Sequence, residues 1–179
     1  MLQREAQVYS LLRDVAGVPH SSGMLDNQHL LFEYIDVESL KDERDALQDA
    51  DVFYTRLRQV ISDIHAAGVA HGDLKRKQNV LVTRHNEPVV IDFGTAVTRH
   101  GGLFDQLLFP LVRRFDDNAW IKVKYARDYT AIAPEDLHWY QPTFVEHTFQ
   151  LILRVWRKLT FRKARKRRKH TRLEKRQAK

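Results

Sequence analysis

The stretch HGDLKRKQNVLVTRHNEPVVIDFGTA, residues 71–96, carries the strongest fold signal in the chain. Asp73 stands two residues after a histidine, Asn79 follows six residues later, and Asp92 comes directly after the apolar run Val89–Ile91. The β-branched residues of the two short apolar runs favour buried strands, and the polar residues between them favour a turn. The stretch therefore predicts a β-hairpin with one polar loop before it and another after it.

These two loops contain the residue types that a magnesium site needs. Mg²⁺ prefers oxygen ligands and usually combines one or two protein carboxylates with the phosphates of a nucleotide. In such a site Asp92 and Asn79 would hold the metal, and Asp73 would accept or orient the proton of an attacking hydroxyl. A polar turn before a buried strand is the structural alternative for the same residues.

Composition excludes several classes of protein. The 179 residues suffice for one domain with a hydrophobic core, or for one small domain and a tail. The chain contains no cysteine, so disulfide frameworks and cysteine-based zinc sites are excluded. The first residues carry Glu5 and no long apolar run, so we expect no signal peptide, and no apolar run is long enough for a membrane-spanning helix.

The net charge of +7 is distributed unevenly along the chain. Residues 1–153 contain 16 Lys and Arg against 22 Asp and Glu, a net charge of −6. Residues 154–179 contain 14 Lys and Arg and a single acidic residue, a net charge of +13. We therefore expect an acidic body with a solvated basic tail that is attracted to polyanions.

Apolar spacing predicts further elements on both sides of the hairpin. The expected helices cover residues 4–16, residues 39–67 and a final stretch that begins near Thr143. The expected strands are a pair within residues 17–36, with a turn at Asp26-Asn27 and Leu30–Ile35 as the second strand, and the hairpin strands Val80–Thr83 and Val89–Ile91. Residues 101–142 are mixed, with Trp120, Tyr125, Trp139 and Tyr140 available for the core.

The order HGDL, NVLV and IDFG resembles the catalytic and metal-binding loops of the protein-kinase-like superfamily. Gly72 stands where typical eukaryotic protein kinases carry Arg, so HGDL is more similar to the atypical branch: the RIO kinases, the KEOPS-complex kinase and the bacterial Kdo/WaaP lipopolysaccharide kinases. The bacterial lipopolysaccharide-kinase and RIO-like group fits best. The resemblance implies an α+β, protein-kinase-like fold. Its parts would be a truncated N-terminal lobe over residues 1–35, a mainly helical C-terminal lobe over 36–160 and a basic tail over 161–179.

The resemblance also implies residues of a nucleotide site for ATP and Mg²⁺. REAQVYSLL resembles the small-lobe helix whose Glu pairs with the ATP-binding lysine, so Glu5 is either the counterpart of that Glu or an ordinary solvated helix residue. HLLFEYID resembles the last small-lobe strand and the hinge, where backbone groups of Glu33, Tyr34 and Ile35 would face adenine. Asp36 either reaches the ribose or lies on the surface at the start of the next helix.

Two departures from the family pattern affect these expectations. The metal-binding Asn of the family stands five residues after the catalytic Asp, where this chain has Gln78. Because Asn79 begins the matching NVLV run, we favour a one-residue insertion with Asn79 as ligand and Gln78 as the alternative. The sequence also begins at the Glu5 helix, so we expect the Gly-rich loop and the nucleotide-lysine strand to be missing from it: either the start was set too late, or another chain completes the lobe, or the kinase is degenerate. The open sheet edge would accept a partner strand.

The expected function is ATP- and Mg²⁺-dependent phosphoryl transfer to a hydroxyl, either on a lipopolysaccharide-core sugar or on a protein Ser or Thr. The alternative is a pseudokinase whose fold scaffolds a partner and whose tail docks on a membrane or RNA. An RNA-associated, RIO-like ATPase is a third interpretation.

The segment FVEHTFQLILRVWRKLTFRKARKRRKH, residues 144–170, combines an apolar stripe with a basic run. It is either a final helix packed on the large lobe or a helix on an anionic membrane surface. The basic run would serve equally well for RNA binding. Its residues are Arg162, Lys163, Arg165, Lys166, Arg167, Arg168 and Lys169. We expect a cytoplasmic protein, peripheral at the inner face of the membrane if the tail binds lipid.

Overall fold

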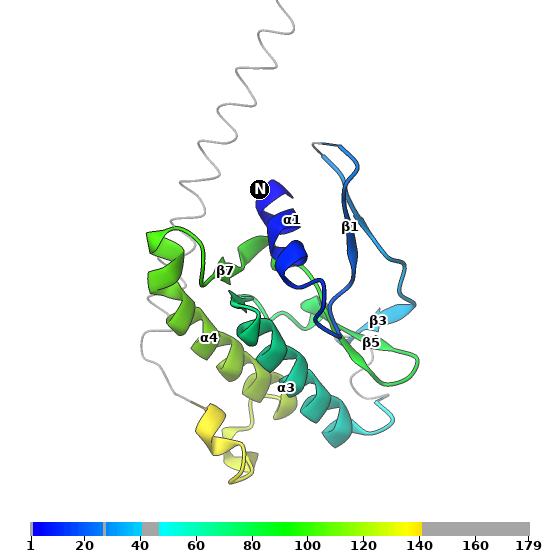
Figure 1. Ribbon diagram of the computed structural model, residues 1–179. Coiled ribbons are helices and arrows are strands. Elements are labelled where there is room, and N and C mark those ends of the chain that lie inside the picture. The colour runs from blue at the N-terminus through cyan, green and yellow to red at the C-terminus, as the bar shows by residue number, and fades with distance from the viewer. Residues whose placement is uncertain (1, 27, 41–46, 141–179) are drawn as a thin grey trace, which may run out of the picture. The chain divides into compact units, whose positions relative to one another are not determined.

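The structure is a computed structural model that describes residues 2–26, 28–40 and 47–140 (Figure 1). The chain divides into two units, Met1–Gln141 and Pro142–Lys179, and every described residue belongs to the first. The predicted final helix and the basic tail lie outside the described residues. No helix within the described part is long and apolar enough to cross a membrane.

Helices and small antiparallel sheets together give the described unit an α+β fold, as predicted. Its helices are α1 (Leu2–Leu11), α3 (Ala50–Ala66) and α4 (Leu103–Lys124). Its strands are β1 (Ser21–Met24), β2 (Leu30–Phe32), β3 (Val37–Ser39), β4 (Val69–Ala70), β5 (Val80–Thr83), β6 (Pro88–Val90) and β7 (Val97–Thr98). Short 3₁₀ helices are η2 (Lys77–Asn79), η3 (Phe93–Thr95), η4 (Tyr129–Ala131) and η5 (Leu137–Trp139).

α1 packs against the antiparallel hairpin of β1 and β2 through its buried face. Val8 and Tyr9 are buried on this helix, and the Tyr9 ring meets the Phe32 ring of β2 edge-on, with 4.5 Å between centroids. The Asp26 carboxylate fixes the hairpin turn by accepting two backbone N–H groups that follow it, at 2.6 and 2.9 Å. The helix and the hairpin confirm the prediction in kind, but the helix ends at Leu11 rather than at residue 16, and the second strand ends at Phe32 rather than at Ile35.

β5 is the central strand of a three-stranded antiparallel sheet, with β3 and β6 on either side. Val80 pairs with Val90 in the β5–β6 hairpin, which confirms the predicted hairpin with β6 beginning one residue earlier. β3 is absent from the sequence prediction, which begins a helix at Ser39 instead. This prediction is wrong at its start, because residues 37–39 pair with β5 and sheet pairing outweighs the local helical pattern.

α3 has a clear signal at each end. The Asp49 side chain accepts the Val52 N–H at 3.0 Å and caps the start of the helix. At the other end Gly68 takes a positive φ of 80°, as a helix stop requires. The buried face has three- and four-residue spacing and consists of Phe53, Tyr54, Leu57, Val60, Ile61, Ile64 and His65.

α4 runs through the stretch that the sequence left as a mixture. It lies beside α3 (Figure 1), and the indole Nε1 of Trp120 donates to the Tyr54 carbonyl of α3 at 2.8 Å. Pro110 inside this helix weakens its helical signal, because proline lacks the N–H that a helix interior uses. Trp120 is buried, and Tyr125, Trp139 and Tyr140 pack partly buried against the same core, as expected.

Candidate active site

The loop before β5 is anchored by the buried carboxylate of Asp116 on α4. Its Oδ2 accepts the backbone N–H of His71 at 2.7 Å, and its Oδ1 accepts the backbone N–H of Gly72 at 2.8 Å. The ring of His65 on α3 donates Nε2–H to Oδ2 at 3.1 Å. Asp116 is 1% exposed, so these contacts compensate its burial and fix the loop against two helices.

Sequence reasoning missed Asp116, although the sequence contains a signal for it. Asp116 lies four residues after Val112 and three before Ala119, both of which are buried. A carboxylate at core spacing on a helix needs buried donors, and the backbone of the HGD motif supplies them.

Gly72 lies close to α4 in a backbone conformation that few other residues adopt. Its φ is +77°, and a Cβ at this position would lie 3.2 Å from Cγ1 of Val112. The positive φ therefore favours glycine, and a Cβ would in addition push against Val112.

The side chain of Asp73 is held inside the loop. Asp73 is 6% exposed, and its Oδ2 pairs with Nε of Arg76 at 3.2 Å. The amide nitrogen of Asn79 donates to the Asp73 carbonyl at 3.2 Å, and Asn79 is 5% exposed. Gln78, the alternative ligand, is exposed. The structure thus brings Asn79, and not Gln78, into the interior beside Asp73.

Three hydrogen bonds connect this loop to the loop after β6. The ring Nε2 of His71 donates to the Ile91 carbonyl at 2.8 Å, which leaves Nδ1 to accept the Asp73 N–H at 3.2 Å. The Ile91 N–H donates to the Asn79 carbonyl at 3.0 Å, and the Thr95 hydroxyl donates to the His71 carbonyl at 3.0 Å. The predicted residues Asp73, Asn79 and Asp92 therefore belong to one cross-linked pair of loops.

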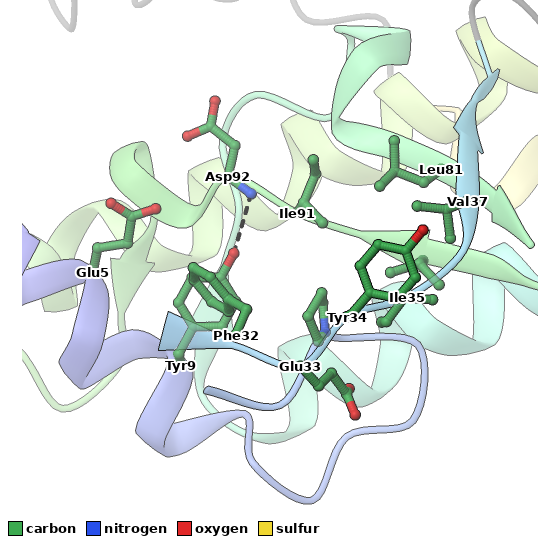
Figure 2. Close-up of a pocket in the computed structure, with 12 residues that line it drawn as sticks. Glu5, Tyr9, Phe32, Glu33, Tyr34, Ile35, Val37, Leu81, Ile91 and Asp92 are labelled. Carbon is green, nitrogen blue, oxygen red and sulfur yellow. Dashed lines mark hydrogen bonds between the residues drawn. The ribbon is translucent and has the colours of Figure 1, made fainter. Parts of the chain in front are cut away.

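Asp92 begins the second loop in an unusual backbone conformation. Its φ of 66° and ψ of 66° are left-handed, and its N–H donates to the Tyr9 hydroxyl at 3.3 Å (Figure 2). The next residue, Phe93, is buried with its ring between the rings of Tyr9 and His71, at centroid distances of 5.2 and 4.8 Å.

A pocket of about 420 Å³ lies between α1, the segment that follows β2, the sheet of β3, β5 and β6, and the start of the loop after β6 (Figure 2). Figure 2 shows the carboxylates of Asp92 and Glu5 at one end and the apolar side chains of Val37 and Leu81 at the other. The lining also includes Tyr9, Phe32, Glu33, Tyr34, Ile35, Val89 and Ile91. A pocket of this size, apolar with a few converging polar groups, suits a small organic ligand with an apolar part and a part that carries or binds charge.

The acidic end of the pocket has an electrostatic signature. Burial raises the pKa of the Glu5 carboxyl, and the negative charge of Asp92 raises it further. A cation bound near these two groups would reduce their repulsion. Within the described residues no three His, Cys, Asp or Glu side chains form a metal-binding group, so a cation here would depend on few side chains and on its ligand.

The predicted hinge residues Glu33, Tyr34 and Ile35 line the pocket, and the structure changes two details of the prediction. The Glu33 N–H donates to the His20 carbonyl at 3.0 Å, so this amide is already used. Asp36 pairs with Arg84 at 2.6 Å and precedes β3, which corrects the expectation that Asp36 begins a helix. The seven tail residues from Arg162 to Lys169 lie outside the described residues.

Comparison with known proteins connects this geometry to a family. The RIO domain model matches residues 1–109, which is more than half of the chain. The serine/threonine-protein kinase PknH of Mycobacterium bovis is 32% identical over 102 residues, which cover 53% of this chain and 17% of that protein. The PknH kinase of Mycobacterium tuberculosis is equally similar over 16% of its length, so the match spans less than a fifth of these curated relatives. These matches confirm the predicted resemblance to the atypical kinase-like superfamily, and the chain belongs to the RIO domain family.

Proposed function

We propose that the protein transfers the terminal phosphoryl group of ATP to a hydroxyl in an Mg²⁺-dependent reaction. The observation that carries this proposal is the cross-linked pair of loops: hydrogen bonds join the loop of Asp73 and Asn79 to Ile91, and Ile91 and Asp92 line the pocket. Membership of the RIO domain family and the similarity to a serine/threonine-protein kinase support kinase-type chemistry and a kinase-like fold. A small lobe over residues 1–35, a large lobe over 36–160 and a separate tail are part of the proposal.

The apolar part of the pocket would receive the adenine ring. The Glu33 N–H is used by His20, so we assign base recognition to the Glu33 carbonyl and the Ile35 N–H. Tyr34 is 91% exposed, so it would contribute through its backbone. Glu5 would face the phosphates or a cation that pairs with them.

The acidic end of the pocket fits Mg²⁺ by the chemistry of its donors. Asn79 uses its amide nitrogen to bind the Asp73 carbonyl, which orients its oxygen as the atom for a cation. Asp92 supplies the carboxylate, and its proximity to Glu5 favours a positive charge between them. When bound, Mg²⁺ would neutralise charge on the phosphates.

Asp73 would act as the catalytic base. Arg76 holds Oδ2 of this carboxylate at 3.2 Å, so Oδ1 is the oxygen that would accept the proton of the acceptor hydroxyl. The hydrogen bond of the Asp73 N–H to His71 fixes the backbone from which the side chain projects.

The acceptor that these observations favour is a protein Ser or Thr. The matched relatives are named serine/threonine-protein kinases, which supports this acceptor. The other acceptor expected from the sequence is a lipopolysaccharide-core sugar. No feature of the described residues favours it. The scaffold alternative differs in a measurable way, because it predicts no Mg²⁺-dependent binding of ATP.

The experiment is thermal unfolding of the full chain with ATP, with Mg²⁺ and with both. Ligand at 100 times its dissociation constant stabilises a protein by about 2.7 kcal/mol, which raises the unfolding temperature by roughly 5–11 °C for a domain of about 150–250 residues. We expect this shift only with both ligands, and we expect Asp92→Asn to abolish it. Asp51→Asn, at an exposed position at the start of α3, is the matched control and should keep the shift. Equal shifts in wild type and Asp92→Asn would contradict the proposed metal site.

The basic segment over residues 154–179 would bind a polyanionic surface, for which its net charge of +13 is the support. The apolar stripe beside it favours the anionic face of a membrane, and hence a peripheral location there. Sedimentation with vesicles containing phosphatidylserine should retain the chain at low salt and release it at high salt. Retention by single-stranded RNA and not by vesicles would contradict the membrane assignment.

A further inference from the structure

The hydroxyl of Tyr9 lies where α1 meets the loop that begins with Asp92. Its oxygen accepts the Asp92 N–H at 3.3 Å, the contact drawn as a dashed line in Figure 2. The ring of Tyr9 is held separately, edge-on to the rings of Phe32 and Phe93 at centroid distances of 4.5 and 5.2 Å. Phenylalanine could make the same ring contacts. The hydrogen bond to Asp92 is therefore the contact that requires the hydroxyl.

The same peptide group is held from its other side. The peptide between residues 91 and 92 consists of the Ile91 carbonyl and the Asp92 N–H. His71 donates to that carbonyl at 2.8 Å, and Tyr9 accepts from that N–H. Because both polar atoms of one planar group are bound, the plane cannot rotate without breaking a hydrogen bond.

The orientation of this plane sets φ of Asp92, one of the torsion angles on which the placement of its side chain depends. Asp92 has φ 66° and ψ 66°, a left-handed conformation that residues other than glycine adopt only where their surroundings impose it. A rotation of the peptide plane would change φ of Asp92 and release the backbone conformation in which its side chain lines the pocket.

We propose that Tyr9 is a positioning residue: its hydroxyl and the His71 ring clamp the 91–92 peptide and thereby aim the Asp92 carboxylate at a cation in the pocket. This inference rests on the proposed function, in which Asp92 holds Mg²⁺. It assigns to α1 a direct influence on cation binding that does not depend on Glu5. A site held in one geometry before the ligand arrives binds more tightly, because no competing conformation has to be displaced.

The test is a titration of Mg²⁺ at fixed ATP, with the unfolding temperature of the full chain as readout. Tyr9→Phe keeps the ring contacts and removes only the hydroxyl. We expect the Mg²⁺ concentration for half-maximal stabilisation to rise about threefold to tenfold, as for the loss of one hydrogen bond. Tyr54→Phe removes a hydroxyl from another buried tyrosine, on α3 and outside this pocket, and should leave the Mg²⁺ titration unchanged.

The outcomes of this test distinguish the positioning role of Tyr9 from the proposed Mg²⁺-dependent binding of ATP. Tyr9→Met, which also lacks the hydroxyl, should shift the titration in the same direction. A wild-type titration curve in Tyr9→Phe would overturn this inference and leave the proposed function standing. The absence of any Mg²⁺-dependent shift in the wild type would overturn the proposed function, and the inference with it.

Discussion

The two walls of the pocket are stabilised in different ways. The loops within residues 71–96 are held by buried, directional hydrogen bonds to Asp116, to His71 and between the loops themselves. The wall of α1, β1 and β2 is held by the Tyr9–Phe32 ring contact and by the β1–β2 pairing with exposed hydrogen bonds such as Ser21 Oγ to the Leu31 carbonyl, and its hairpin leaves Leu25 68% and Leu31 42% exposed. The residues proposed for chemistry belong to the hydrogen-bonded segments, here called the rigid wall, whereas Glu33 and Ile35, proposed for base recognition, directly follow a two-stranded hairpin of low intrinsic stability.

The largest effect should come from removing the anchor of the rigid wall. Asp116→Ala leaves the buried N–H groups of His71 and Gly72 without their acceptor, so the free energy of unfolding should fall by about 3 kcal/mol. Denaturant unfolding measures this loss, with Asp51→Ala at the exposed start of α3 as the control. A loss below about 1 kcal/mol would show that the loop does not depend on Asp116.

Two glycines allow the walls to be compared directly. Gly72 and Gly23 both have positive φ, at 77° and 92°, but a Cβ would be crowded only at Gly72. We expect Gly23→Ala to lower the free energy of unfolding by about 1 kcal/mol through backbone strain alone, and Gly72→Ala to lower it by about 2–3 kcal/mol because the contact with Val112 is added. Equal losses in the two variants would mean that the loop can move away from α4 at no cost.

A smaller, pH-dependent effect is expected from Glu5. Burial, and then the charge of Asp92, raise the pKa of Glu5 in the folded protein above its ordinary value of 4.5. The folded state therefore keeps this proton to higher pH than the unfolded state, and the contribution of Glu5 to stability falls as the pH rises from 4.5 through the raised pKa.

Glu5→Gln should remove this dependence, so that the variant gains stability relative to wild type as the pH rises. Unfolding temperatures measured without ligand between about pH 4 and pH 7 test the sign. Parallel curves for the two proteins would show that Glu5 titrates as an exposed carboxyl.

The local parts of this site could be predicted from the sequence. The β5–β6 hairpin and the residues Asp73, Asn79 and Asp92 follow from short-range patterns, since apolar runs and turn residues mark each boundary. Gln78 and Asn79 are adjacent, so sequence spacing left both as ligands. The structure distinguishes the two residues, because Asn79 is buried and bonds to the Asp73 carbonyl, whereas Gln78 is exposed.

The remaining parts depend on contacts between distant residues. β3 is only three residues long and becomes a strand because it pairs with β5, more than 40 positions later. Asp116 is an acid beside a second acid on a helix, a pattern that ordinarily indicates a solvated surface. The Tyr9 hydroxyl reaches the Asp92 backbone 83 residues away in sequence, and no local pattern encodes that contact.

The central claim is that Asp73 provides chemistry in a site that binds ATP with Mg²⁺, and Asp73→Asn tests it most directly. Turnover of ATP and the affinity for Mg²⁺-ATP should be measured on the same preparations of wild type and variant. We predict an affinity within about twofold of wild type, with turnover reduced by about 10²- to 10⁴-fold, the usual contribution of a general base. Turnover equal to that of wild type would contradict the role of Asp73, and no turnover or binding in the wild type would contradict the account as a whole.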